Sequence, residues 1–357
     1  MNKRIFTTIS ILVIFLNSCN IGDDYKPISH LEFLKTHRYN IGQTTLELND
    51  EERNRPIKVE IWYPTKDTLK SNGTLQYPFK LPPTSRDADI VPENFPLILL
   101  SHGTGGNRIS QMWLASELVG NGNIVVAVDH YGNTLDNKIP ENFVKIWDRP
   151  MDISFTLDKI LGNPKFQSSI DSTKIGMAGF SLGGYTTIAL AGGIIDYNLL
   201  KEFSTTVEGK NEFDLPELGD VSQFVTPSII EMGNKKYKNL KDSRIIAFLA
   251  MAPALGQGFS QESQFIAIEN PLLIIGAAND LLTPVKTNAK HYNNLIANSQ
   301  YFQLEGNVGH YIFMNEAQNG LKRNAPIVFK DDKNVDRKEL HNKISKMAIE
   351  FFSKELK

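Results

Sequence analysis

Short apolar runs recur along the chain, and segments with helical spacing separate them. The runs richest in Val, Ile, Leu and Ala predict buried parallel strands; they span residues 97–102, 124–130, 174–180, 244–253, 271–280 and 300–306. Two earlier runs, 44–48 and 57–63, alternate apolar and polar residues. Alternation of this kind is typical of strands at an antiparallel edge, where one face of the sheet meets water.

Helical patterns lie between and after these runs. They cover residues 109–120, 148–162, the segment that follows Ser181, 284–298 and 336–356. The last segment shows the spacing most clearly, at Leu340, Ile344, Met347, Ala348 and Phe351. Strands that alternate with helices indicate βαβ units. The sequence therefore predicts an α/β protein with a mostly parallel, doubly wound sheet and helices on both faces.

Residues 195–243 break this alternation. The segment mixes Lys, Glu and Asp with scattered apolar residues and contains no run typical of a buried strand. It is too long for a plain loop in a compact domain. We predict a small helical cap inserted over the C-terminal edge of the sheet. A disordered surface excursion is the alternative interpretation.

The N-terminus has the pattern of an export signal. Lys3 and Arg4 precede an apolar run at 5–16, which is shorter than the roughly 20 residues that a membrane span needs. The "LNSC" that follows resembles a bacterial lipobox, in which the cysteine, here Cys19, becomes the lipidated first residue. An ordinary signal peptide that leaves a free thiol at Cys19 is the alternative.

The lipobox interpretation divides the chain. It predicts a lipoprotein signal peptide at 1–18 and a polar tether at 19–40, followed by one α/β domain at 41–357 that includes the cap. We expect the protein to be exported and lipid-anchored in the bacterial cell envelope, at the outer membrane, with its folded part in water.

Composition narrows the function classes. The chain has 357 residues, of which 41% are hydrophobic and 22% charged, and its net charge is -2, which fits a soluble globular fold. The absence of a basic excess argues against a nucleic-acid partner. Because Cys19 is the only cysteine, an intramolecular disulfide is excluded, and so is a cysteine nucleophile in the mature fold.

The motif G-x-S-x-G occurs at 179–183, as Gly-Phe-Ser-Leu-Gly. The bare pattern is weak, because chance supplies it in roughly one of ten chains of this length at average Gly and Ser usage. Its position is more specific: Ser181 lies between a predicted buried strand and a predicted helix, where a nucleophile elbow places its serine. Flanking glycines allow strand and helix to approach closely. The alternative is a structural turn with an N-capping serine.

A serine nucleophile needs a base and an orienting acid, which follow it in the order Ser, acid, His in doubly wound hydrolases. His310 follows the last predicted strand, whereas the other histidines precede the serine or lie in helices. Asp280 ends a predicted buried strand after Ser181, whereas Asp129, which also ends a strand, precedes the serine. We predict His310 as base and Asp280 as acid. The alternative for His310 is a loop histidine with satisfied hydrogen bonds, and the alternative for Asp280 is a helix N-cap.

Acyl transfer also needs two donors for the oxyanion. We assign one to the backbone N–H of Leu182, directly after the nucleophile, and the other to Thr104 in the loop "SHGTGGNR". The glycines of that loop fit neither a P-loop nor a dinucleotide fingerprint. No His, Asp or Glu cluster has metal-ligand spacing, so we expect no cofactor and no metal.

Together these residues resemble the α/β-hydrolase superfamily. Within it they are similar to the bacterial branch called predicted dienelactone hydrolases, itself similar to the plasma-type platelet-activating factor acetylhydrolases. The matching stretches lie between residues 57 and 313 and read "LILLSHGTGGNR", "VVAVDHYGN", "RPMDISFTLDKIL", "KIGMAGFSLGGYTTIALAG", "PLLIIGAANDLLTP" and "GNVGHYIF". The resemblance implies the α/β-hydrolase fold, the triad Ser181, Asp280 and His310, and oxyanion donors at Thr104 and Leu182.

Two departures limit what the resemblance implies. Authentic dienelactone hydrolases use a cysteine nucleophile, so the branch name does not define the activity of a chain with Ser181. Phe180 stands where many relatives carry histidine, which leaves the mechanism intact and changes the pocket.

The predicted function is hydrolysis of a small-molecule or lipid carboxylic ester through an acyl-enzyme on Ser181. Catalytic alternatives are a phospholipase A2-like hydrolase of short or oxidised acyl chains, a polyesterase, and a peptidase or acyltransferase with the same triad. Outside catalysis, the alternative is a surface-binding lipoprotein on an inactive hydrolase scaffold. The sequence makes no prediction about the oligomeric state.

Overall fold

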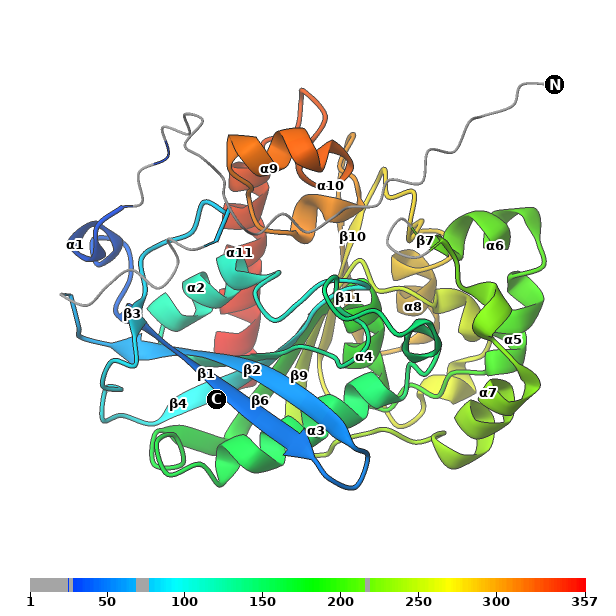
Figure 1. The fold of residues 1–357 in the computed structure, drawn as a ribbon, viewed down its shortest axis with the longest axis horizontal. Coiled ribbons are helices and arrows are strands. Elements are labelled where there is room, and N and C mark those ends of the chain that lie inside the picture. Colours follow the sequence, from blue (N-terminus) through cyan, green and yellow to red (C-terminus); the bar gives the residue numbers. More distant parts are fainter. Residues whose placement is uncertain (1–24, 26–27, 69–76, 216–218) are drawn as a thin grey trace.

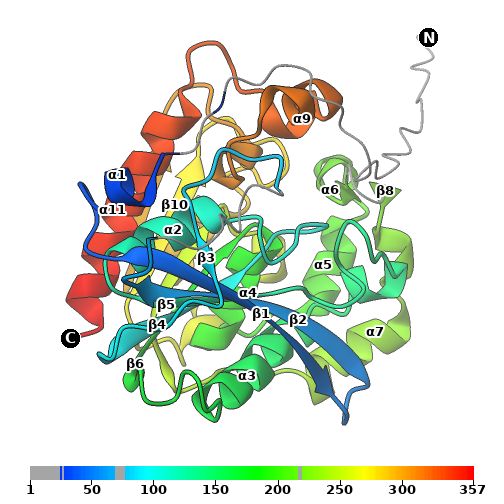
Figure 2. The same cartoon turned by 60° about the vertical axis from the view of Figure 1, so that its left-hand side comes forward.

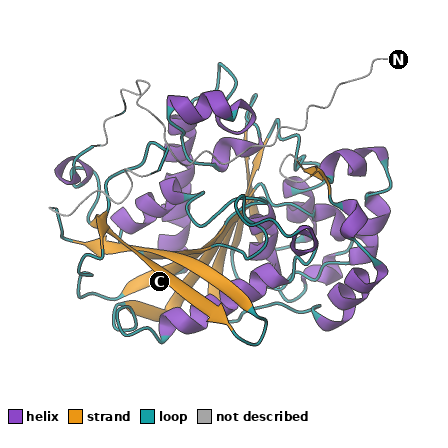
Figure 3. Ribbon diagram, in the orientation of Figure 1, coloured by secondary structure: helices purple, strands orange, loops and turns teal. Residues whose placement is uncertain are grey.

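The computed structural model describes residues 25, 28–68, 77–215 and 219–357, so the predicted signal peptide and Cys19 lie outside the described residues. The described chain is built on a nine-stranded sheet in the order β11-β10-β9-β6-β4-β5-β2-β1-β3, with helices packed around it (Figures 1 and 3). Its strands are β1 (Asn40–Asp50), β2 (Arg55–Thr65), β3 (Ser85–Arg86), β4 (Phe95–Ser101), β5 (Ile124–Val128), β6 (Ile170–Phe180), β9 (Ile245–Met251), β10 (Leu272–Ala277) and β11 (Ser299–Leu304).

Helices lie between and after the strands along the chain. They are α1 (His30–Phe33), α2 (Met112–Gly120), α3 (Asp148–Leu161), α4 (Leu182–Ala191), α5 (Tyr197–Phe203), α6 (Val207–Glu212), α7 (Pro227–Glu231), α8 (Ala289–Leu295), α9 (Asn319–Asn324), α10 (Pro326–Phe329) and α11 (Arg337–Glu355). Short helical turns join them at η1 (Pro140–Phe143), η2 (Ser222–Phe224), η3 (Met232–Lys236), η4 (Gly256–Gly258), η5 (Glu262–Phe265) and η6 (His310–Phe313). Among the described residues, no helix combines the length and apolar character that crossing a membrane requires.

The sheet is mostly parallel. Six strands pair with one another in parallel, in the order β5, β4, β6, β9, β10 and β11. β1 and β2 form an antiparallel hairpin, which joins this set through the antiparallel pair of β2 with β5. The mostly parallel sheet predicted from the apolar runs is therefore confirmed, and so is its antiparallel edge.

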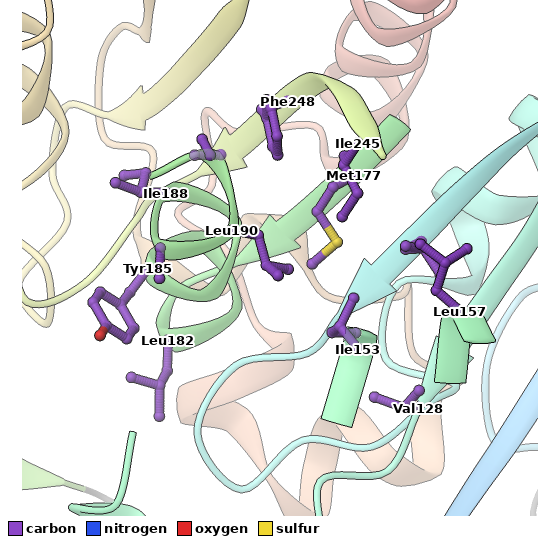
Figure 4. Close-up of a cluster of buried hydrophobic side chains, with 14 of the residues drawn as sticks. Val128, Ile153, Leu157, Met177, Leu182, Tyr185, Ile188, Leu190, Ile245 and Phe248 are labelled. Carbon is purple, nitrogen blue, oxygen red and sulfur yellow. The ribbon is translucent and has the colours of Figure 1, made fainter. Parts of the chain in front are cut away.

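Both faces of the central strands are buried, which explains their continuous apolar runs. In β4, Leu97 and Leu99 pack toward α3 and α4, whereas Ile98 and Leu100 pack toward α2 and α11. Figure 2 shows α2 and α11 on one side of the sheet and α3 on the other. Figure 4 shows part of the apolar cluster on the α3–α4 face of the sheet, in which side chains of α3 and α4 pack against those of β6 and β9.

The segment 195–243 contains α5, α6 and α7, the short ribbon of β7 (Asp214–Leu215) with β8 (Gly219–Asp220), and two helical turns. It packs at the end of the sheet near α8 (Figure 1). Its side chains Leu200, Phe213 and Val225 are buried in the core cluster of the α3–α4 face. The scattered apolar residues of the segment thus hold it against the body.

Two local boundaries differ from the sequence predictions. The helix predicted at 284–298 is α-helical only over α8, because Asn288 has non-helical φ and ψ of -129° and -100° and Thr287 closes a turn back onto Pro284. The tether predicted at 19–40 is structured toward its end. Phe33 is buried, and the Arg38 amide donates to the Gly120 carbonyl at 2.8 Å.

Candidate active site

Ser181 lies in the sharp turn between β6 and α4, with φ 56° and ψ -118°. This backbone conformation is strained for a residue with a Cβ, and such strain is concentrated at functional sites. The turn is possible because its neighbours are glycines: a Cβ on Gly179 would collide with the Gly183 carbonyl, and one on Gly183 with the Ser101 carbonyl. The Ser181 side chain makes no capping hydrogen bond to α4, so the N-cap alternative does not describe it.

His310 connects the predicted nucleophile to the predicted acid. Its Nε2 lies 2.9 Å from Ser181 Oγ, and its Nδ1 lies 2.6 Å from Asp280 Oδ2. Because an ionised carboxylate only accepts hydrogen bonds, the proton of the neutral ring is on Nδ1 and Nε2 is free to accept from the serine hydroxyl. Three residues from loops after β6, β10 and β11 therefore form one hydrogen-bonded chain.

Asp280 is held by more than His310. Its Oδ1 accepts from the amides of Leu282 and Thr283 at 2.9 and 2.7 Å, and its Oδ2 accepts from Thr283 Oγ1 at 2.8 Å. Burial alone would raise the pKa of Asp280, but the His310 ring and the hydrogen bonds of His310 and Thr283 outweigh burial and lower that pKa. Asp280 is therefore charged near neutral pH. It caps a local turn and not α8, whose N-cap is Asn288.

The remaining histidines and Asp129 have other partners. His291 and His341 bond to the carbonyls of Phe259 and Ile312. Asp129 binds Arg108 at 2.6 Å.

The loop after β4 lies against the elbow. A Cβ on Gly103 would come within 3.1 Å of Ser181 Cβ. Leu182 is the first residue of α4, so its amide has no carbonyl one turn earlier to bond. Within the part of the chain that the structure describes, the amides of Thr104 and Leu182 have no hydrogen-bond acceptor. Both predicted oxyanion donors therefore lie next to the nucleophile and are unengaged.

His102 fixes the direction of the Thr104 amide. Its Nε2 accepts the backbone N–H of His130 at 3.2 Å, so the proton of the neutral ring is on Nδ1, which donates to the Gly103 carbonyl at 2.6 Å. Burial, the Arg149 charge and His130 lower the pKa of His102 well below its usual value, which keeps the ring neutral. Because a trans peptide is planar, the Thr104 N–H points away from the carbonyl that His102 binds.

Comparisons with known proteins agree with this architecture. No family model matches the chain, and none of the curated proteins matches it. Among solved structures, a ferulic acid esterase from Streptomyces cinnamoneus superposes with a TM-score of 0.60 at 18% identity, covering 90% of this chain and 91% of that one. The chain has the α/β-hydrolase fold. The predicted superfamily-level fold is thus confirmed, whereas the dienelactone and acetylhydrolase branch stays a prediction.

A buried polar network that the sequence reasoning missed lies beneath the α/β-hydrolase elbow. His130 Nε2 is 2.9 Å from Ser101 Oγ, and its Nδ1 is 3.0 Å from Asp152 Oδ2, which also binds Arg55 at 2.8 Å. Ser101, His130 and Asp152 are fully buried, so this second Ser-His-Asp arrangement has no access to a substrate. The only signal in the sequence was "RPMD", quoted for the resemblance and given no role of its own.

A cavity of about 520 Å³ opens beside Ser181 and His310. This volume lies within the usual range of small-molecule sites. Its walls are mostly apolar and come from the cap, from η1 and from α10, with Leu200, Phe213, Phe143 and Phe329 among them. Phe180 also lines it, with its ring 4.8 Å from that of His310. Phe180 therefore presents an apolar surface next to His310.

Glu212 is the cap residue that brings a charge to this cavity. It accepts hydrogen bonds from Gln257, from Thr287 Oγ1 at 3.0 Å and from Asn288 Nδ2 at 3.1 Å. Burial raises the pKa of Glu212. The carboxylate therefore joins the last turn of α6 to the body beside the triad.

Proposed function

We propose that the chain is a serine hydrolase of carboxylic esters. The observation that carries this proposal is the hydrogen-bonded chain from Ser181 through His310 to Asp280, next to two unengaged amides and an apolar cavity. The fold shared with a ferulic acid esterase is compatible with this activity. No step of the reaction calls on a cofactor or a metal.

The geometry supports a two-step acyl transfer. Ser181 Oγ bonds to the ester carbonyl carbon while its proton moves to His310 Nε2, and the carbonyl electron pair moves onto oxygen. The amides of Thr104 and Leu182 stabilise that oxyanion. When the carbonyl re-forms, the bond to the alcohol breaks and His310 returns the proton to the leaving oxygen. Water then repeats the sequence on the acyl-enzyme and releases the acid.

The proposal is tested by Ser181→Ala. We expect the variant to stay folded and to lose hydrolysis of p-nitrophenyl butyrate together with labelling by a fluorophosphonate probe. Ser345→Ala is the matched control, because this buried serine in α11 has no hydrogen-bond partner among the described residues. Undiminished turnover in Ser181→Ala would refute the proposal. A wild-type chain that neither cleaves esters nor takes up the probe would favour an inactive binding lipoprotein.

The apolar cavity favours one substrate class as a second candidate. We propose that short or oxidised acyl chains of phospholipids are hydrolysed as well, as the resemblance to acetylhydrolases implies. The support is the mostly apolar lining beside Ser181. A panel of p-nitrophenyl esters and phosphatidylcholines of increasing acyl length tests this candidate. Turnover of soluble esters without any phospholipid turnover would overturn it.

Export and anchoring stay proposals that rest on the N-terminal sequence. We propose that Cys19 carries the lipid and holds the enzyme at the bacterial cell envelope. Labelled palmitate should enter the wild-type chain and not Cys19→Ser. Incorporation that survives the substitution would overturn the anchor.

A further inference from the structure

Arg149 is a buried cation that donates no hydrogen bond to a carboxylate of the described residues. The residue lies in the first turn of α3 and is 1% exposed. Among the described residues, its guanidinium donates only to neutral oxygens: Thr186 Oγ1 at 3.3 Å, Asn133 Oδ1 at 3.2 Å, Ser101 Oγ at 3.3 Å and the His102 carbonyl. The nearby carboxylate of Asp152 is engaged by Arg55 through two hydrogen bonds.

Two of these acceptors belong to the two segments that carry the oxyanion donors. Thr186 lies in α4, whose first amide is that of Leu182, and its hydroxyl also bonds to the Leu182 carbonyl at 3.0 Å. The His102 carbonyl belongs to the loop that carries Thr104. Asn133 Oδ1, in turn, accepts the Gly105 amide of the same loop at 3.4 Å. One planar guanidinium therefore connects the two segments that present the oxyanion donors.

The burial of this charge is unfavourable for the fold. Isolated buried cations carry a desolvation penalty that neutral acceptors offset only in part. Burial lowers the pKa of Arg149 to about 9, so the guanidinium is still charged at neutral pH. A positive charge fixed beneath the elbow favours negative charge that develops on the substrate oxygen, and fixed charges of this kind are most effective away from water.

We propose that Arg149 is a positioning residue that clamps the Thr104 loop to the N-terminus of α4 and so sets the spacing of the two oxyanion donors. This inference rests on the proposed esterase function. The clamp acts on the transition state, because the oxyanion exists only there and in the tetrahedral intermediate. Its loss therefore lowers kcat and leaves KM nearly unchanged.

Thr186→Val tests the clamp with the smallest change of shape. It removes the hydroxyl that Arg149 Nε binds in α4. Thr156→Val is the matched control, because Thr156 is an equally buried threonine of α3 whose hydroxyl has no partner among the described residues. Arg149→Lys is the second test variant. It keeps the charge but cannot reach the separate acceptors with one planar group.

The readouts are kcat and KM for p-nitrophenyl butyrate and the rate of phosphonylation by a fluorophosphonate, on variants shown to be folded by circular dichroism. We expect kcat and the phosphonylation rate to fall about tenfold in Thr186→Val and about a hundredfold in Arg149→Lys, with KM within about twofold. Thr156→Val should match the wild type.

Unchanged kcat and phosphonylation in folded Thr186→Val would overturn the clamp, and so would a loss confined to KM. If Arg149→Lys does not fold, the kinetics of Thr186→Val still test the clamp. The phosphonylation rate separates this inference from the proposed function. A wild-type chain that reacts with the probe but cleaves no ester would contradict the esterase, while the variants would still test the clamp.

Discussion

At the scale of single residues, the site depends on how Asp280 fixes the proton of His310. The carboxylate is almost fully buried and accepts from His310 Nδ1 at 2.6 Å, while two amides and the Thr283 hydroxyl hold it in place. Its lowered pKa means that the carboxylate carries its charge near neutral pH. The ring is therefore kept in the one tautomer that can accept the proton of Ser181.

Asp280→Asn tests this dependence. The amide offers an N–H where Asp280 only accepts, so His310 shifts toward the tautomer with the proton on Nε2, which cannot act as a base. We expect kcat for p-nitrophenyl butyrate to fall by about 10³–10⁴-fold, as for acid-to-amide changes in other triads, with little change in KM. Asp129→Asn is the matched control, because this strand-end acid binds Arg108 and not a histidine of the site. A kcat of Asp280→Asn equal to that of the control would contradict the assigned role.

At the scale of elements, the cap is joined to the body by polar contacts beside the cavity. Glu212 ends α6, and its three hydrogen bonds reach Gln257 and the turn that precedes α8. Its neighbour Phe213 lines the cavity. Glu212 therefore helps, together with the buried apolar residues of the cap, to set the position of the cap wall beside the cavity.

Glu212→Ala is expected to loosen the cap without disturbing the triad. The substitution removes the acceptor for the side-chain amides of Asn288 and Gln257. It should therefore lower the free energy of unfolding by about 1–3 kcal/mol. KM should rise several-fold for long-chain p-nitrophenyl esters and less for the acetate, with kcat nearly constant. Thermal unfolding and kinetics check both effects, and Glu208→Ala, an exposed residue of the same helix, is the control. An unaltered KM for every chain length would show that the cap does not shape the site.

Prediction from the sequence was successful where one segment determined its own structure. The strand and helix order followed from apolar runs buried on one or two faces, and the elbow from glycines whose Cβ atoms would collide with backbone. The geometry also brings Ser181, Asp280 and His310 together, although their catalytic roles stay predictions. Arg149, His102 and Asn133 could not be linked in this way, because the hydrogen bonds that join them connect separate loops and exist only in the folded chain.

At the scale of the whole molecule, the fold keeps several histidines neutral in its interior. Burial, followed by the Arg149 charge, lowers the pKa of His130 to about 3, and burial lowers that of His341 to about 4. His102, also buried, is shifted in the same direction. In the unfolded chain these rings take up protons near pH 6.5. The native state therefore binds fewer protons than the unfolded state between that pH and about 4, and its stability falls as the pH is lowered.

Acid should destabilise the protein as the pH falls below about 6.5, where the unfolded chain protonates these histidines. Each buried neutral histidine contributes a slope of up to about 1.4 kcal/mol per pH unit between about pH 6.5 and 4. His341→Gln removes one such group, so the free energy of unfolding should depend less steeply on pH in that variant. Urea unfolding at a series of pH values measures both slopes. Stability that is constant from pH 7 to pH 4.5 would contradict neutral burial of these rings.

Trapping the acyl-enzyme during turnover shows whether Ser181 is the nucleophile. The wild-type chain is mixed with p-nitrophenyl butyrate, quenched in acid during turnover, digested and analysed by mass spectrometry. We predict one butyryl group on the peptide that contains Ser181, absent when Ser181→Ala is treated in the same way and present in Ser345→Ala. Ester turnover with the butyryl group on another residue, or a butyryl group that persists in Ser181→Ala, would show that Ser181 is not the nucleophile.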